Sequence, residues 1–270
     1  MINHLDDEVI KHNLQTLYGL DKVPSDTYLR ERLDEISPAN LRKPFKSVFS
    51  ALQRGKALEG YEYIDGHYLL SIDGTGYFSS HDIHCDNCCV KNHRDGKTTY
   101  YHQMFGAVLV NPDHKEVLPF APEPILKQDG VKKNDCERNA AKRLLSDLRR
   151  EHPHLKLIVI EDGLASNGPH IRLLQSLNMR FILGAKPSDH KFLFNWVDNS
   201  NALTYEIKDD DGTLHRFRFI NQVPLNDACF DLNVNFLEYW EIAPNGKQKQ
   251  HFSWVTDLLL TEKTIFKIMK

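Results

Sequence analysis

The sequence lacks the long apolar runs and the one-sided charge that mark several classes of protein. No apolar stretch approaches the roughly 20 residues that a membrane-spanning helix needs. The chain also does not begin with a basic segment followed by an apolar one, as a secretory signal would. Lys and Arg number 34 and Asp and Glu 37, a formal net charge of -3, so the chain as a whole does not attract phosphate. We therefore expect a cytoplasmic protein with no membrane partner, whose nucleic-acid surface, if it has one, is local.

Cysteine is also scarce, and its distribution argues against a secreted disulfide framework. The five cysteines are Cys85, Cys88, Cys89, Cys136 and Cys229. Cys85 and Cys88 have the spacing of a zinc-binding pair. A tetrahedral site would take two further ligands from three neighbours: Cys89, His84 and His93. Because no second Cys-x-x-Cys pair is present, a loop of reduced thiols is the alternative to a structural Zn²⁺ site.

Residues 1–60 carry helical signals and no strand alternation. Ser25, a helix-capping residue type, precedes an amphipathic stretch that includes Leu29 and Leu33. We expect a small helical region, which is a candidate for DNA binding because basic side chains gather in it. They are Arg30, Arg32, Arg42, Lys43 and Lys46.

Residues 61–186 combine strands and helices in an informative order. The expected strands of an antiparallel meander are residues 68–73, 100–110 and 116–120. The first of these is expected to stop at a turn, because Gly74 and Gly76 follow it. The next expected elements are a helix at 135–150 capped by Asn134 or Asp135, a strand at 155–160, a helix at 169–177 and a strand at 180–183. A meander followed by strand-helix alternation predicts an α/β fold with a mixed sheet.

The remaining residues form two further expected segments. Residues 187–258 alternate polar and apolar side chains around turn sequences, which predicts a β-rich insertion. Residues 259–270 begin a helix with Thr261 as its cap. A second basic cluster, which is either a phosphate-contacting surface or a solvated helix face, comprises Lys127, Lys132, Lys133, Arg138, Lys142 and Arg143.

Asp73 and Asp162 share a position in the expected fold, since each ends a short apolar strand and precedes a glycine. Ligand sites in open sheets favour such strand ends. If the two strands are neighbours, both carboxylates can bind the same divalent ions, and hard oxygen ligands select Mg²⁺ or Mn²⁺. For each aspartate alone, ordinary turn chemistry is the alternative interpretation.

Three segments extend this argument by resemblance. Residues 69–80 (LLSIDGTGYFSS), 134–143 (NDCERNAAKR) and 157–168 (LIVIEDGLASNG) resemble DDE-type transposases of bacterial insertion sequences, in the subgroup with a β-rich insertion in a ribonuclease-H-like core. The similarity runs from about residue 17 to the end. It implies that Asp73 and Asp162 are catalytic, that Mg²⁺ or Mn²⁺ is the cofactor, and that DNA is cleaved and strand-transferred. The partners it implies are DNA, as element ends and as target, and a second copy of the chain.

The third carboxylate of that family is a glutamate on a helix after the insertion, in a tyrosine, arginine, glutamate and lysine pattern that this sequence lacks. We therefore expect a chain that is truncated at its C-terminus. Because members of that family usually carry a further DNA-binding segment upstream, we expect a truncated N-terminus as well. Glu137 is the better substitute, because Glu161 should face away from Asp162 and Glu262 precedes the expected helix. The alternatives to a transposase are a ribonuclease-H-like nuclease that joins no strands and an inactive DNA-binding remnant.

Overall fold

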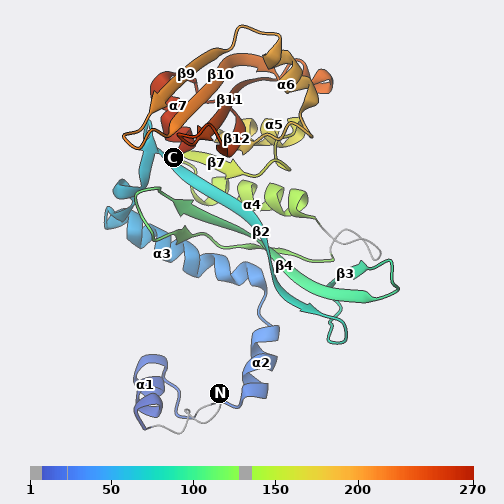
Figure 1. Ribbon diagram of the computed structural model, residues 1–270. Coiled ribbons are helices and arrows are strands. Elements are labelled where there is room, and N and C mark those ends of the chain that lie inside the picture. Colours follow the sequence, from blue (N-terminus) through green and yellow to red (C-terminus); the bar gives the residue numbers. More distant parts are fainter. Residues whose placement is uncertain (1–7, 23, 128–135) are drawn as a thin grey trace. The chain divides into compact units, whose positions relative to one another are not determined.

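The computed structural model divides the chain into two compact units (Figure 1): Met1–Lys43 and Pro44–Lys270. The described residues are 8–22, 24–127 and 136–270. Four residues named above lie outside these ranges: Lys132, Lys133, Asn134 and Asp135. Within the described ranges, the helices are too short or too polar to cross a bilayer.

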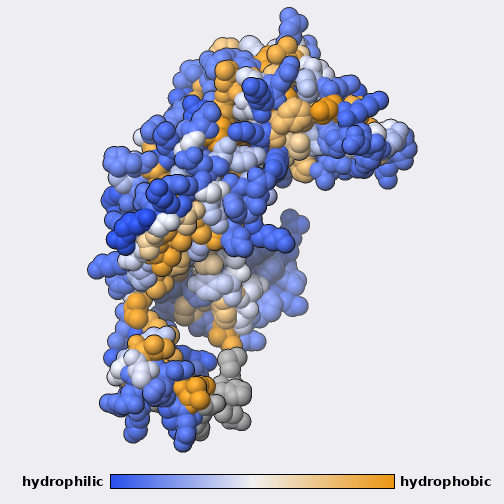
Figure 2. Space-filling view, turned by 90° about the vertical axis from the view of Figure 1, so that its left-hand side faces the viewer, coloured by the Kyte–Doolittle hydropathy of each residue, from blue (hydrophilic) through white to orange (hydrophobic). Residues whose placement is uncertain are grey.

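The first unit is helical in its described part. It contains α1 (Glu8–Tyr18), α2 (Asp26–Asp34) and the 3-10 helix η1 (Pro38–Leu41). Ser25 caps α2 as predicted, because its side chain accepts a hydrogen bond from the Tyr28 backbone N–H at 3.2 Å. No described residue of these three helices is buried, and apolar side chains of this unit are visible at the surface in Figure 2.

The second unit is built on one sheet of twelve strands within the described residues. In chain order the strands are β1 (Glu62–Ile64), β2 (His67–Ser80), β3 (Cys89–Asn92), β4 (Thr98–Val110), β5 (Leu118–Pro119), β6 (Glu123–Ile125), β7 (Leu157–Glu161), β8 (Arg180–Gly184), β9 (Leu203–Lys208), β10 (Leu214–Pro224), β11 (Asn233–Ile242) and β12 (Gln248–Thr256). The spatial order is β3-β4-β2-β7-β8-β12-β11-β10-β9, with β1 on β2 and with β5 and β6 on β4. Pairs β2–β7 and β7–β8 are parallel and the others antiparallel, so the expected mixed α/β sheet is confirmed.

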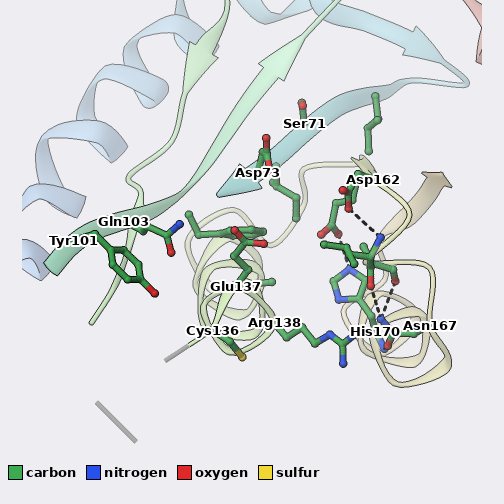
Figure 3. A pocket seen from close by; sticks show the side chains of 17 residues that line it. Ser71, Asp73, Tyr101, Gln103, Cys136, Glu137, Arg138, Asp162, Asn167 and His170 are labelled. Carbon is green, nitrogen blue, oxygen red and sulfur yellow. Dashed lines mark hydrogen bonds and ion pairs between the residues drawn. The ribbon is translucent and has the colours of Figure 1, made fainter. Parts of the chain in front are cut away.

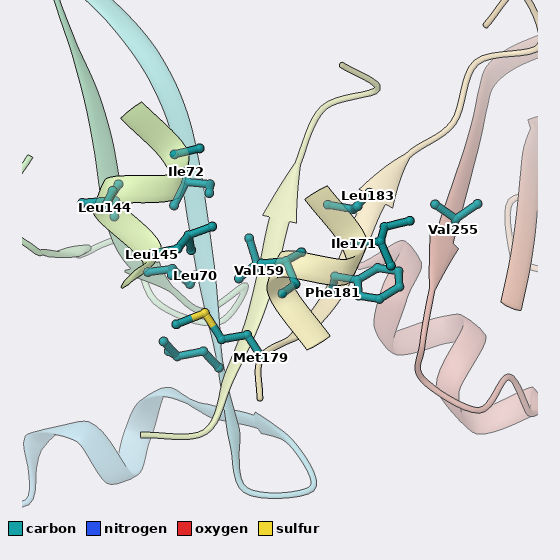
Figure 4. Packing of buried hydrophobic residues seen from close by; sticks show 14 of the residues in the cluster. Leu70, Ile72, Leu144, Leu145, Val159, Ile171, Met179, Phe181, Leu183 and Val255 are labelled. Carbon is teal, nitrogen blue, oxygen red and sulfur yellow. The ribbon is translucent and has the colours of Figure 1, made fainter. Parts of the chain in front are cut away.

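Helices cover both faces of this sheet. They are α3 (Arg42–Arg54), η2 (Ala57–Tyr61), α4 (Glu137–Glu151), α5 (Gly168–Ser176), α6 (Lys191–Asp198), η3 (Asp227–Cys229) and α7 (Glu262–Met269). The five apolar positions of α4 that recur three and four apart are all buried, as predicted: Ala140, Ala141, Leu144, Leu145 and Leu148. They pack with Leu70 of β2 and Val159 of β7 in the main apolar cluster (Figure 4).

A second apolar cluster covers the opposite face, where Ile158 of β7 meets Ile265 of α7. Since Val159 and Ile158 belong to opposite clusters, β7 is buried on both faces, as its continuous β-branched run indicated. The predicted cap of α7 is also present, because Thr261 accepts a hydrogen bond from the Thr264 backbone N–H.

The first strand does not stop at the turn that the sequence predicted. β2 continues to Ser80, because the residues beyond Asp73 pair with the equally long strand β4. The register shifts between Gly76 and Phe78, a β-bulge that accommodates Tyr77. Tertiary pairing thus overrides the local turn signal and carries the hairpin past the end of the expected strand.

Strands β9 to β12 lie in the segment that the sequence marked as an insertion, together with α6, which the sequence did not predict. These strands prolong the central sheet, since β12 pairs antiparallel with β8 through Val255 and Leu183. The expected antiparallel meander is present as β2, β4 and β5, although its third strand is only the two residues of β5.

Candidate functional site

Asp73 within β2 and Asp162 just after the end of β7 lie at the same level of two neighbouring parallel strands. The register pairs Ser71 of β2 with Ile160 of β7, and each aspartate lies two residues further along its chain segment. Paired strands run about 4.8 Å apart, so the two aspartates lie close together at the level where β7 ends and β2 continues alongside β4. The structure therefore brings together the two residues that the sequence singled out (Figure 3).

Both aspartates line a pocket of about 710 Å³ that is bounded by β2, β4, β7 and the starts of α4 and α5. Its other polar lining residues are Ser71, Tyr101, Gln103, Cys136, Glu137, Arg138, Glu161, Asn167 and His170. Four carboxylates therefore border one cavity. Such a concentration of negative charge is expected to attract cations.

Backbone N–H groups orient the two aspartates. The Gly74 N–H donates to Asp73 Oδ1 at 2.7 Å, and the Leu164 N–H donates to Asp162 Oδ1 at 3.0 Å. Such local bonds also occur in ordinary turns. Within the described residues, however, Oδ2 of each aspartate has no hydrogen bond, so one oxygen of each exposed carboxylate is available to solvent or to a cation.

Glu137, the first residue of α4, is the third carboxylate at this edge. Its side chain lies so close to Gly74 that a methyl group at position 74 would overlap Glu137 Oε1. The pKa of Glu137 is raised, first by burial and then by the negative charges of Asp73 and Asp162. The three carboxylates are therefore close enough to repel one another, and Glu137 shares the pocket with both aspartates.

Glu161 lines the same pocket, although strand alternation predicted that it would face away from Asp162. Alternation does not apply, because β7 ends at Glu161 and Asp162 belongs to the following turn. Glu161 Oε1 lies 2.5 Å from Nε2 of His170 on α5, in a pair whose side chains are only 7% and 10% exposed.

The surroundings of Glu161 act on its charge in opposite directions. Burial raises its pKa, the bond to His170 lowers it, and the charges of Asp162 and Asp73 raise it further. Because His170 already engages this carboxylate, Glu161 is better suited to support the pocket than to bind a cation. Glu262, the third glutamate considered, begins α7 and does not line the pocket.

A second group of metal-ligand side chains lies on the part of the β2–β3–β4 hairpins that we call the hairpin extension (residues 76–104). Sγ of Cys85 and Sγ of Cys88 are 3.7 Å apart, and each lies 3.3 Å from Nε2 of His102. Burial is the main cause that raises the pKa of the Cys88 thiol. The group confirms that the Cys-x-x-Cys pair meets a histidine, in an arrangement compatible with zinc.

Cys89 and His93, which the sequence offered as further zinc ligands, are not in this group. Cys89 lies opposite Tyr101 in the β3–β4 register and is fully buried in the main apolar cluster. Because Cys89 is held in that cluster, Cys88, which immediately precedes β3, is the one of the two cysteines that meets His102. His93 lies at the tip of the β3–β4 hairpin, where its Nε2 is 2.8 Å from Thr99 Oγ1.

His102 is the histidine that meets the two cysteines, whereas the sequence predicted His84 or His93. His84, the other candidate, stacks on Tyr100 with ring centroids 4.3 Å apart. His102 follows Cys88 by 14 residues and lies inside β4, outside any local motif. Strand alternation was the only signal in the sequence that could have indicated His102. It predicts that the His102 side chain lies on the opposite side of the sheet from that of Tyr101.

No protein-family model matches this chain. The curated proteins compared with it give no match either. The chemistry of both groups therefore has to be inferred from their own residues. Oxygen donors in the acidic pocket suit Mg²⁺ or Mn²⁺, whereas two sulfurs and an imidazole suit a softer ion such as Zn²⁺.

Proposed function

We propose that this chain is a DNA transposase of the DDE class, whose acidic pocket binds Mg²⁺ or Mn²⁺ and whose partners are the element ends and the target DNA. The observation that carries the proposal is the meeting of Asp73, Asp162 and Glu137 in one pocket beside two parallel strands. The element order, a meander and then helix, parallel strand, helix and parallel strand, supports a ribonuclease-H-like core. The resemblance at residues 69–80 and 157–168 includes both aspartates.

The reaction consists of two substitutions at phosphorus. In the first, a water oxygen bonds to phosphorus as the P–O3′ bond breaks, which frees a 3′-hydroxyl at the element end. In the second, that 3′-hydroxyl oxygen bonds to a target phosphorus while one P–O bond of the target breaks. Metal ions held by the acidic pocket would activate the attacking oxygen and stabilise the leaving oxygen.

The residues of the pocket have different roles in this proposed reaction. Asp73 from β2 and Asp162 from the turn after β7 would hold the cations, and Glu137 would approach them from α4. Arg138, next to Glu137 in the pocket lining, provides a positive charge for a phosphate of the bound strand. Behind them, the buried pair of Glu161 and His170 fixes the end of β7 against α5.

A nuclease that hydrolyses DNA or RNA without joining strands is the second candidate. Glu137 favours it, because a set of three carboxylates from within the core needs no ligand from another segment. The third candidate is a transposase remnant, which binds DNA without cleaving it.

Nicking of a supercoiled plasmid in Mn²⁺ tests the proposal. We expect nicking by the purified chain and its loss in Asp73→Asn and in Asp162→Asn. The matched control is Asp231→Asn, an exposed aspartate paired with Arg172 outside the pocket, which should nick as the wild type does. Equal activity in all four proteins would exclude the pocket as the active site.

A labelled oligonucleotide with a free 3′-hydroxyl separates the candidates. Products longer than the substrate, joined to plasmid DNA, indicate a transposase. Shortened products alone indicate the nuclease, and a shifted but intact oligonucleotide indicates the remnant.

A further inference from the structure

The hairpin extension (residues 76–104) has almost no hydrophobic core. Every residue of β2 from Gly76 to Ser80, and of β4 from Thr98 to Met104, is at least partly exposed. The buried residues of the extension are Cys88 and Cys89. Segments with so little apolar burial usually need a disulfide or a metal ion to hold one conformation.

The three ligand atoms of Cys85, Cys88 and His102 already have the spacing of a metal site. A tetrahedral Zn²⁺ with bonds of about 2.3 Å to sulfur and 2.0 to 2.1 Å to nitrogen places two sulfurs about 3.8 Å apart and sulfur and nitrogen about 3.6 Å apart. The corresponding distances here are 3.7 Å and twice 3.3 Å. One ion therefore fits among the three atoms with shifts of a few tenths of an ångström.

The two cysteines are held by their own backbone. The Cys88 N–H donates to the Cys85 carbonyl oxygen at 3.1 Å, which closes a tight turn. In return the Cys85 N–H points at Cys88 Sγ, 3.3 Å away. An N–H directed at sulfur stabilises a thiolate, the form in which cysteine binds metal.

His102 is fixed with Nε2 toward the sulfurs. Its ring stacks on Tyr77 with centroids 5.8 Å apart and meets Phe78 at 5.7 Å. Its Nδ1 is buried without a hydrogen-bond partner in the described residues. The polar contacts of the ring in the described part of the chain are therefore the two sulfurs.

We propose that Cys85, Cys88 and His102 bind a Zn²⁺ ion that stabilises the hairpin extension, with the fourth position of the ion open on the side of the exposed Cys85. The ion joins the loop between β2 and β3 to the middle of β4 and so replaces the core that the hairpin extension lacks. His102 also lies between Tyr101 and Gln103, which both line the acidic pocket. The ion would thus fix the strand that forms one wall of that pocket, but zinc binding itself does not depend on the proposed function.

Zinc titration of the full chain, reduced and stripped of metal, tests the site. In competition with a chromogenic chelator, we expect one Zn²⁺ per wild-type chain. Loss of a second-shell group alone weakens metal binding 10- to 100-fold, so Cys88→Ser and His102→Gln should bind at least about 100-fold more weakly. The matched control is His93→Gln, which removes a histidine of the same segment that lies outside the group and should bind as the wild type does.

Co²⁺ provides an independent readout of the ligands. Wild-type protein should give the intense visible bands of a tetrahedral site together with sulfur-to-cobalt charge transfer. Cys88→Ser should lose part of the charge transfer, whereas His102→Gln should keep it and change the visible bands. The proposal is overturned if reduced wild-type chain binds no stoichiometric zinc, or if His93→Gln loses zinc while His102→Gln retains it. Circular dichroism of each variant separates lost ligands from lost fold.

Discussion

The two ends of the long β2–β4 hairpin are stabilised by different interactions. In β2, Leu69, Leu70 and Ile72 are buried against apolar side chains of the two clusters. From Asp73 to Ser80 no residue of the same strand is buried. The acidic pocket lies at the boundary between these two parts, so its first aspartate is anchored by the core on one side and open to solvent on the other.

This difference shows how one hairpin can serve two kinds of site. The buried end is held by many non-directional contacts, each of which contributes to the stability of the whole unit. The hairpin extension instead has a single directional group of three side chains. A substitution at the buried end should therefore destabilise the whole unit, whereas loss of one of the three side chains should destabilise only the hairpin extension.

The largest effect is expected from Leu70→Ala at the buried end. Leu70 is fully buried in the main cluster beside α4 (Figure 4), so its truncation leaves a cavity and should lower the free energy of unfolding by about 2 to 5 kcal/mol. Urea unfolding of the whole chain measures the loss. Val117→Ala, at a position 49% exposed, is the control and should change stability by less than about 0.5 kcal/mol. A cost for Leu70→Ala as small as that of the control would contradict the packing of this end.

At the boundary, Glu137→Gln should reduce Mn²⁺-dependent nicking by about 100-fold, which corresponds to about 2.7 kcal/mol in the activation free energy. The reason is that Glu137 holds a metal ion as a carboxylate in the proposed mechanism, and an amide cannot replace that charge. Glu161→Gln is the matched comparison, since glutamine can still bond to His170, and it should lower nicking by less than about 10-fold. If the two variants exchange these effects, Glu161 and not Glu137 is the third ligand.

Much of the buried end could be predicted from local patterns. The 3.6-residue period of α4 and the continuous apolar run of β7 each determine which side chains meet the core. The strand-end position of Asp162 likewise follows from a short apolar run that ends in aspartate and glycine, whereas the same pattern at Asp73 lies inside β2. Each of these signals lies within a window of a few residues.

The features that the sequence did not predict depend on pairings between distant segments of the chain. Gly74 and Gly76 indicate a turn locally, but the partner strand β4 holds them in an extended hairpin. Which of Cys88 and Cys89 faces His102 is decided by the β3–β4 register. The place of Glu137 in the pocket is decided by the packing of α4 beside Gly74. None of these relations can be read from one segment alone.

A smaller effect is expected from pH. The pKa of Glu137 in the folded chain is raised above its ordinary value of 4.5, so between these two values the folded state binds more protons than the unfolded state. Its contribution to stability is therefore complete below pH 4.5 and is lost as pH rises through the folded pKa. Urea midpoints between pH 4.5 and 7.5 in magnesium-free buffer measure this decline.

Asp73→Asn is the control for the pH effect, because it removes one of the charges that raise the pKa of Glu137. The decline with pH should be shallower in this variant, and added Mg²⁺ should flatten the wild-type profile by neutralising the same repulsion. Identical pH profiles for both proteins would show that the carboxylates do not interact across the pocket.

The smallest effect on overall stability is expected at the hairpin extension, from removal of zinc or from Cys88→Ser. Because the extension contributes little apolar burial, the free energy of unfolding measured in urea should change by less than about 1 kcal/mol. Backbone amides of β3 and of residues 77–80 should nevertheless exchange their hydrogens much faster, while those of Leu70 and Val159 should not change. Hydrogen exchange read by mass spectrometry resolves the two regions in one experiment, with His93→Gln as the control. Faster exchange throughout the sheet would mean that the extension and the core unfold together, and the contrast between the two ends of the hairpin would not hold.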